Sequence, residues 1–151
     1  MEKQGSRALG LPWIALIGLA LLAVPRVVLH DLDAIQEGDF VNLLLVFVPL
    51  LVWVVVAVMA RVPKPFLTLL VVGGLYGIFL ALGHQILWDR SVGDDVTLGG
   101  NLEGRLSPGV EEFVIRTFSV FSSLFTGLLV GAVTGLVAWG AGKLLRSSTK
   151  V

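Results

Sequence analysis

The chain of 151 residues contains no cysteine, and this absence excludes disulfides, thiolate metal sites and cysteine-based redox chemistry. The short motifs of common catalytic sites are missing as well. There is no nucleophile elbow, phosphate-binding Walker loop, zinc-protease helix or dithiol pair. We therefore expect a protein that is not an enzyme, that carries no cofactor and that has no nucleic-acid partner.

Charged residues are scarce. Only 15% of the residues are charged, whereas 56% are hydrophobic, and the mean hydropathy is +0.91. A soluble domain of this size could not bury so much apolar surface. The apolar residues also come in runs of about 20 residues, which is the length that crosses a bilayer. The sequence therefore predicts an integral membrane protein.

Four apolar runs are separated by polar or turn-forming segments, and they define four expected transmembrane helices at 8–29, 40–60, 66–87 and 112–145. The connecting loops are then 30–39 and 88–109 on one side and 61–65 on the other. Pro25 and Pro49 should disturb two of the helices, because proline lacks an N–H. We predict an all-α fold in which residues 1–151 form a single antiparallel four-helix membrane bundle.

Two local features allow a second interpretation. The basic start, apolar body and small residues of the first run are also features of a secretory signal peptide. We favour a retained span, because the apolar run continues past Pro25 and no clear cleavage site precedes a polar segment. In the loop 88–109, Gly99 and Gly100 are placed to turn a short hairpin between 96–98 and Leu102.

The basic residues are distributed unevenly between the two sides. Four spans place both termini on one side, which carries seven basic residues and one acid, a net formal charge of +6. The other side carries four basic residues and ten acids, a net formal charge of −6. By the positive-inside rule, both termini should be cytoplasmic, and the small size favours a bacterial inner membrane. An acidic vestibule that attracts cations is the functional alternative to a role in orientation alone.

Small residues recur at every fourth position in the third and fourth spans. The two rows are Gly73, Gly77 and Ala81, and Ser123, Gly127, Gly131 and Gly135. On a helix, such a row forms one smooth side, which lets a second helix approach closely. We favour an antiparallel contact between spans three and four within one chain. A homo-oligomeric interface and a pore lined by glycine and hydroxyls are the alternatives.

The centre of every span lacks ionisable residues, which argues against ion-coupled transport. The most interior charge is Arg116, and Glu112 lies four residues before it, in the favourable order for a helical ion pair. Arg26 has a similar depth on the first span. We expect these three residues to form one structural ionic network with Glu111 and Asp31, with an anion or lipid-headgroup site at Arg26 and Arg116 as the alternative.

His30 and His84 each lie near the outer end of a span. Paired histidines can hold haem or, with neighbouring aspartates, a transition metal. The spacing shows neither an HxxxH nor an ExxH pattern. We therefore favour two interfacial histidines without a ligand, and we expect no metal site.

Three functions follow from these patterns, and no motif in the chain is diagnostic of a known family. The favoured function is a non-enzymatic membrane protein that acts through helix–helix association, as a homo-oligomer or as a small subunit of a complex with another membrane protein. The second is a passive channel or permease subunit, with a path along Arg116, Ser119, Ser123, Thr126 and Thr134. The third is a haem- or metal-binding membrane protein that uses His30 and His84.

Overall fold

The structure is a computed structural model, and it describes residues 8–91 and 96–148. Within these residues every regular element is a helix: α2 (Trp13–Leu22), α3 (Val24–Asp31), α4 (Phe40–Met59), α5 (Pro65–Ile86), α6 (Trp88–Ser91), the 3-10 helix η1 (Gly100–Leu102) and α7 (Pro108–Ser148). With α2 and α3 taken together as Trp13–Asp31, four of the helical segments are long and apolar enough to cross a membrane. The prediction of an all-α chain with four such segments is therefore confirmed.

The first span is divided into two helices near Pro25, where the sequence predicted a disturbance. The N–H of Ala23 donates to the carbonyl of Ala20 in a short turn, and Pro25 has no N–H to offer. The indole N–H of the fully buried Trp53 in α4 donates to the carbonyl of Leu19 at 2.7 Å. Because a carbonyl without a donor is costly in lipid, this bond stabilises the break.

Helix α4 continues through Pro49, whose side chain is buried. Asp39 occupies the N-cap position of α4, but its carboxylate makes no cap bond to the helix. It accepts the N–H of Gln36 instead, at 2.8 Å. The carboxylate of Asp39 therefore stabilises the loop 32–39 and not the first turn of α4.

Helix α7 is longer than the expected span 112–145. Its 41 residues correspond to about 60 Å, roughly twice the thickness of the hydrocarbon core of a bilayer. The predicted hairpin before it is wrong, because residues 96–99 form no strand and 100–102 form η1. The N–H of Leu98 donates to Glu111 in α7 at 2.5 Å, so this stretch is tied to a helix instead of pairing with itself.

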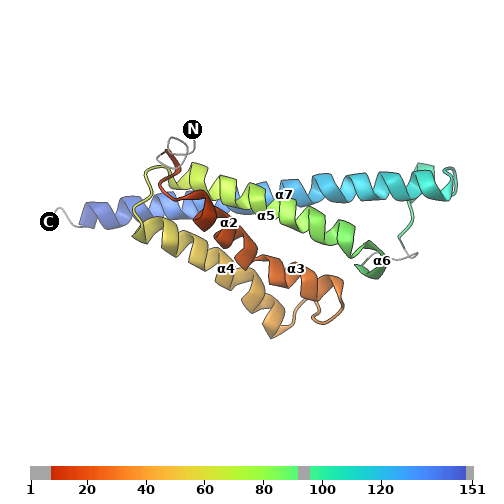
Figure 1. Ribbon diagram of the computed structural model, residues 1–151, viewed down its shortest axis with the longest axis horizontal. Coiled ribbons are helices and arrows are strands. Elements are labelled where there is room, and N and C mark those ends of the chain that lie inside the picture. The colour runs from red at the N-terminus through yellow and green to blue at the C-terminus, as the bar shows by residue number, and fades with distance from the viewer. Residues whose placement is uncertain (1–7, 92–95, 149–151) are drawn as a thin grey trace.

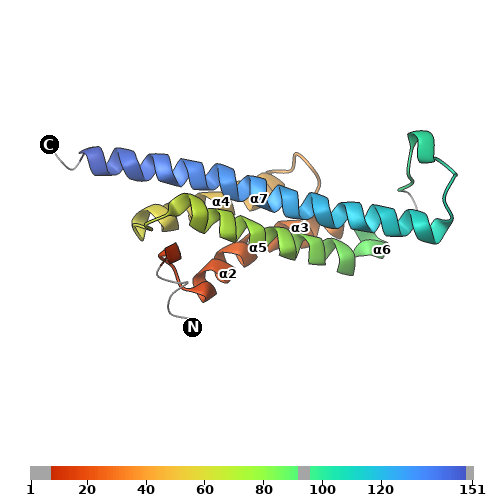
Figure 2. The same ribbon diagram turned by 90° about the horizontal axis from the view of Figure 1, so that it is seen from above.

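Helix α5 lies at the centre of the molecule. Figure 1 shows α5 beside the middle of α7, and α4 runs obliquely below both helices in this view. In Figure 2, α5 separates α7 from α2, and both neighbours contact it. The most deeply buried side chains come from the helices that meet around α5, and they include Leu16, Trp53, Leu69 and Val72.

The two ends of the molecule differ in charge. One end, on the left of Figure 1, contains the α4–α5 turn and the last turns of α7. We call it the basic end, because its described residues include no acid and carry Arg61, Lys64, Lys143 and Arg146. The opposite end, which we call the acidic end, carries Asp31, Asp33, Glu37, Asp39, Asp89, Glu103, Glu111 and Glu112.

Candidate functional site

The small-residue rows of α5 and α7 face each other within one chain. A Cβ atom added to Gly73 would lie 2.6 Å from the Cα of Gly131, and one added to Gly127 would lie 2.5 Å from the Cα of Gly77. A Cβ atom on Gly135 would meet the backbone of Phe66 at 2.9 Å. Carbon atoms do not approach so closely in proteins. Only glycine at these positions allows the two backbones to be in contact.

The residues at the ends of the two rows, Ser123 and Ala81, are also buried. Ser123 is 4% exposed, and a Cβ atom on Gly77 would lie 3.0 Å from the Ser123 carbonyl. Ala81, at the end of the α5 row, is also buried. The structure thus has the contact within one chain that we favoured among the three interpretations. Because α5 and α7 cover both rows, association with another chain needs a different surface.

A buried carboxylate brings the two histidines together at the acidic end. Asp31, the last residue of α3, is 4% exposed. Its Oδ2 atom is joined to Nδ1 of His84 in α5 by a hydrogen bond of 2.8 Å. Its Oδ1 atom lies 3.9 Å from Nδ1 of His30. We call these three residues the Asp31 cluster. It links the first span to the third.

The imidazole of His84 also borders a hollow of about 190 Å³, whose lining includes Trp88, Ser119, Ser122 and Ser123. A catalytic Ser–His–Asp relay requires a hydrogen bond between a serine hydroxyl and the histidine. The hydroxyl of Ser123 donates instead to the carbonyl of Ser119 at 2.7 Å. Among the serines whose side chains the structure describes, none is bonded to His84. The described serines of this hollow therefore form no Ser–His–Asp relay with His84 and Asp31.

The Asp31 cluster also bears on the haem or metal interpretation. Nδ1 of His84 is engaged by the carboxylate of Asp31, which leaves Nε2 as the free ring nitrogen of that residue. In the described part of the chain, no three His, Asp or Glu side chains are grouped so that they could hold a metal ion. The geometry adds no support for His30 and His84 as ligands.

The expected ionic network divides into two separate contacts. Arg116 donates from Nε to Oε1 of Glu112 at 2.8 Å, and its guanidinium lies over the ring of Trp88, 4.7 Å from the centroid. Arg26 donates from Nε to Oδ1 of the buried Asn42 at 3.1 Å. Arg116 thus connects α7 to α6, and Arg26 connects α3 to α4. Both arginines act between helices of this chain.

The residues of the expected polar path do not line one cavity. Ser119 and Ser123 border the hollow at His84, whereas Thr134 borders a different hollow near Phe47. Thr126 is exposed on the surface of α7. The hydroxyl of Thr134 donates back to the carbonyl of Val130 at 2.8 Å, so its hydrogen bond stays within its own helix.

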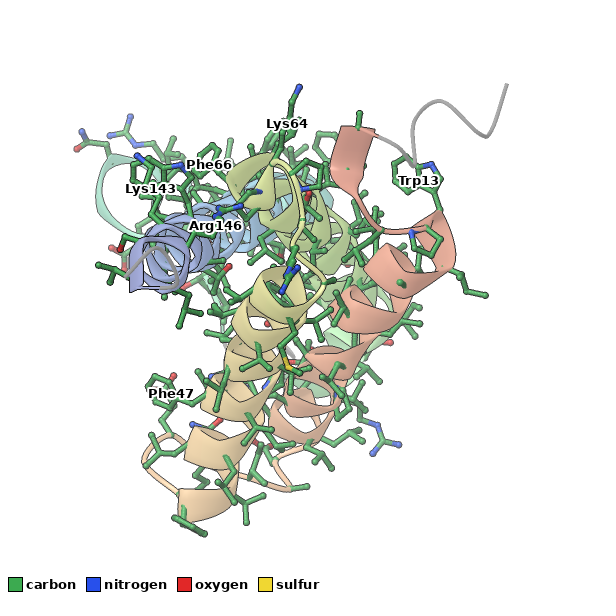
Figure 3. All side chains as sticks on the ribbon, turned by 90° about the vertical axis from the view of Figure 1, so that its left-hand side faces the viewer. Trp13, Phe47, Lys64, Phe66, Lys143 and Arg146 are labelled. Carbon is green, nitrogen blue, oxygen red and sulfur yellow. The ribbon has the colours of Figure 1, made fainter. Side chains whose placement is uncertain are left out.

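A groove runs between α4 and α7, and we call it the α4–α7 seam. It has a volume of about 380 Å³ and is lined by Phe47, Val48, Leu50, Leu51, Val54, Thr134 and Val137. Figure 3 looks at the molecule from the basic end and shows Phe47 projecting from α4 on the side where α7 lies. All of the lining residues except Thr134 are apolar.

A larger hollow of about 680 Å³ lies beside the seam at the basic end, and we call it the basic groove. Its lining consists of Ala57, Val58, Met59, Arg61, Val62, Pro65, Ala138, Gly142, Leu145 and Arg146. Ala57 follows Val54 of the seam by about one helical turn, and Ala138 follows Val137 directly. The two hollows therefore adjoin along both helices.

Sequence reasoning missed the Asp31 cluster, the α4–α7 seam and the basic groove. The signal for the cluster was a carboxylate beside His30 at the end of a span, but the sequence does not say which histidine a buried aspartate will meet. The hollows depend on the angle between α4 and α7, and their apolar lining looks like any lipid-facing surface.

No family model, curated protein or solved structure matches the chain.

Proposed function

We propose that this chain is a non-enzymatic membrane protein that acts through helix–helix association, as a small subunit of a membrane complex or as a homo-oligomer. The α4–α7 seam is the proposed contact surface. The observation that carries the proposal is that the seam is an apolar groove between two helices that the described residues of the chain leave unfilled.

The weak attachment of α4 supports this choice. In the most apolar part of each span, 44% of the residues of α5 are buried but only 22% of those of α4. The half of α4 nearer the acidic end exposes a series of large apolar side chains, namely Phe40, Val41, Leu43, Leu44, Phe47, Val48 and Leu51.

Exposure alone is ordinary in lipid, because lipid tails are as apolar as these side chains. The shape of the seam adds the argument. A helix placed in the seam contacts both walls and gains van der Waals contact on two sides, whereas a helix on a flat face gains it on one. The small-residue rows cannot serve this purpose, since α5 and α7 cover them.

We further propose that the basic end is cytoplasmic and that the membrane is a bacterial inner membrane. The support is the charge distribution, in which Arg61, Lys64, Lys143 and Arg146 gather at one end without any acid among the described residues there. The positive-inside rule places such an end in the cytoplasm.

Bulky substitutions in the seam test the proposal. Val54→Trp and Val137→Trp fill the groove from its two walls, and Leu129→Trp is the matched control, because Leu129 is 53% exposed on α7 and does not line the seam. Crosslinking in native membranes, followed by mild extraction and native mass spectrometry, reports the associated chains. We expect both seam variants to lose association at least about tenfold, which corresponds to about 1.4 kcal/mol, while the control retains it.

Two differently tagged copies in the same cells separate the two forms of association. If the two tagged copies purify together, the chain is a homo-oligomer. If they do not, but a second protein purifies with either copy, the chain is a subunit of a larger complex. Association that is equal in the wild type and in both seam variants would contradict the proposed surface.

A further inference from the structure

The basic groove combines two surfaces that are rarely found together. Its walls are apolar, with Ala57 and Val62 on one side and Ala138 on the other, and these three side chains are buried. Two arginines, Arg61 and Arg146, also line it. A volume of about 680 Å³ with this arrangement suits a molecule that has an apolar body and an anionic head.

Arg61 is held on the rim by a strained turn. The N–H of Arg61 donates to the carbonyl of Val58, and the N–H of Val62 donates to that of Ala57, both at 3.1 Å. These two bonds form a Schellman motif at the end of α4, in which the position of Arg61 is normally glycine. Arg61 adopts it with a φ of 50°. Residues held in such a backbone conformation cluster at ligand-binding sites, and Arg61 lines the groove.

Arg146 is oriented by its own helix. Its Nε atom donates to the carbonyl of Gly142 at 2.8 Å. Gly142 leaves room for this, since a Cβ atom there would lie 3.2 Å from a terminal nitrogen of Arg146. Arginine offers five donors, and no described residue accepts a hydrogen bond from its terminal nitrogens, so their N–H groups are left for a ligand.

The cations at this end lack anionic partners in the described part of the chain. The ion pairs there involve Asp31 and Glu112, both at the acidic end, and neither Arg61 nor Arg146 has a carboxylate partner. Lys143 lies over the ring of Trp139 at 3.9 Å, an arrangement suited to the membrane interface. Figure 3 shows Lys64, Lys143 and Arg146 at the same end of the molecule.

We propose that the basic groove binds an anionic phospholipid of the adjacent leaflet. Arg61 and Arg146 contact the headgroup phosphate, for which guanidinium is a bidentate partner. One acyl chain lies along the apolar walls formed by Ala57 and Ala138, towards the seam. Basic pockets between transmembrane helices are a known mode of headgroup binding. This site needs one chain only and does not depend on the proposed helix–helix association.

Native mass spectrometry of the full chain in detergent, with added phosphatidylglycerol or phosphatidylcholine, tests the charge requirement. The variant is Arg61→Gln with Arg146→Gln, and the control is Arg90→Gln with Arg105→Gln, which removes the same charge at the acidic end. We expect the wild type and the control to retain phosphatidylglycerol at least about fivefold over phosphatidylcholine. The groove variant should lose about thirtyfold in phosphatidylglycerol binding, as expected for two basic contacts of about 1 kcal/mol each at a membrane surface.

A second pair of variants tests the groove itself without changing any charge. Gly142→Leu places a side chain in the groove, whereas Gly140→Leu places the same side chain where an added Cβ meets nothing within 4 Å. Thermal unfolding in detergent verifies that both variants are folded. Phosphatidylglycerol binding should fall in Gly142→Leu and persist in Gly140→Leu.

Three results would overturn the proposal: equal retention of the two lipids by the wild type, an equal loss in the control that lacks Arg90 and Arg105, or full binding by the groove variant. Competition with glycerol phosphate tests whether the site requires the acyl chains of the lipid. If it displaces the lipid at equal concentration, the site recognises free phosphate and not a phospholipid.

Discussion

Arg61 combines an unfavourable backbone with a favourable place for its side chain. A left-handed conformation costs a residue with a Cβ about 1–2 kcal/mol, and glycine avoids this cost. The sequence nevertheless has arginine at this point, directly after α4, where the residue lines the basic groove.

We predict that Arg61→Gly stabilises the lipid-free protein by about 0.5–1 kcal/mol, since the relief of strain exceeds the added chain entropy of glycine. Unfolding in detergent, followed by the fluorescence of the four tryptophans, measures the change. Lys64→Gly is the control in the same turn, because Lys64 has a φ of −130° and no such strain to lose. A gain in both variants, or in neither, would contradict the explanation.

Asp31 is the residue on which two spans meet. We predict that Asp31→Ala lowers the free energy of unfolding by about 1–3 kcal/mol, because the substitution leaves Nδ1 of His84 without its partner in a largely buried place. Glu37→Ala, at an exposed position of the following loop, should change it by less than about 0.5 kcal/mol. Chemical denaturation in a mild detergent measures both values, and equal effects would show that the Asp31–His84 bond contributes nothing specific.

At the scale of the elements, the contact between α5 and α7 is the most extensive among the described helices. Hydrophobic association does not operate between helices in lipid, so the two helices must gain van der Waals contact instead. The glycine rows supply this contact, because no side chain then separates the backbones of α5 and α7. A larger residue can replace a glycine of α7 only where that glycine faces away from α5.

We predict opposite signs for the same substitution at two glycines of α7. Gly127→Ala should destabilise the protein by about 1–3 kcal/mol, because its Cβ would lie 2.5 Å from the backbone of Gly77 and force the helices apart. Gly140→Ala meets no neighbour within 4 Å and should stabilise by about 0.5–1 kcal/mol through helix propensity. Thermal unfolding in detergent compares the two, and a stable Gly127→Ala variant would show that the backbones are not in contact.

At the scale of the whole molecule, charge divides the structure into a basic and an acidic end. Helix α7 reaches from one to the other and extends beyond α5 at the basic end, as Figure 2 shows. Its last turns carry Lys143 and Arg146, which contribute to the rim and surroundings of the basic groove. One long helix therefore connects the central packing to the basic surface.

The absence of cysteine makes the orientation directly measurable. In single-cysteine variants, we predict that Glu37→Cys reacts with a membrane-impermeant maleimide in intact cells, whereas Ser147→Cys reacts only after the membrane is opened. Both native residues are exposed, so accessibility to the reagent depends on the side of the membrane. The reverse pattern of labelling would show that the basic end faces outward, against the positive-inside rule.

Composition and periodicity were sufficient for the class of protein and the place of its helices. Runs of about 20 apolar residues must be helical in lipid, because no water is present to satisfy the backbone, and this fixes four spans from hydropathy alone. The four-residue spacing of glycine fixed which sides of α5 and α7 are smooth. The break near Pro25 followed from the missing N–H of proline.

The tertiary structure alone decided which of these elements meet. A smooth row fits a partner in the same chain or in another equally well, and only the fold places Gly73 and Gly77 on Gly127 and Gly131. His84 meets Asp31 across 53 residues, a distance over which no local pattern carries information. The basic groove is lined by residues of both α4 and α7, and the packing between helices, not any one segment of sequence, sets how they meet.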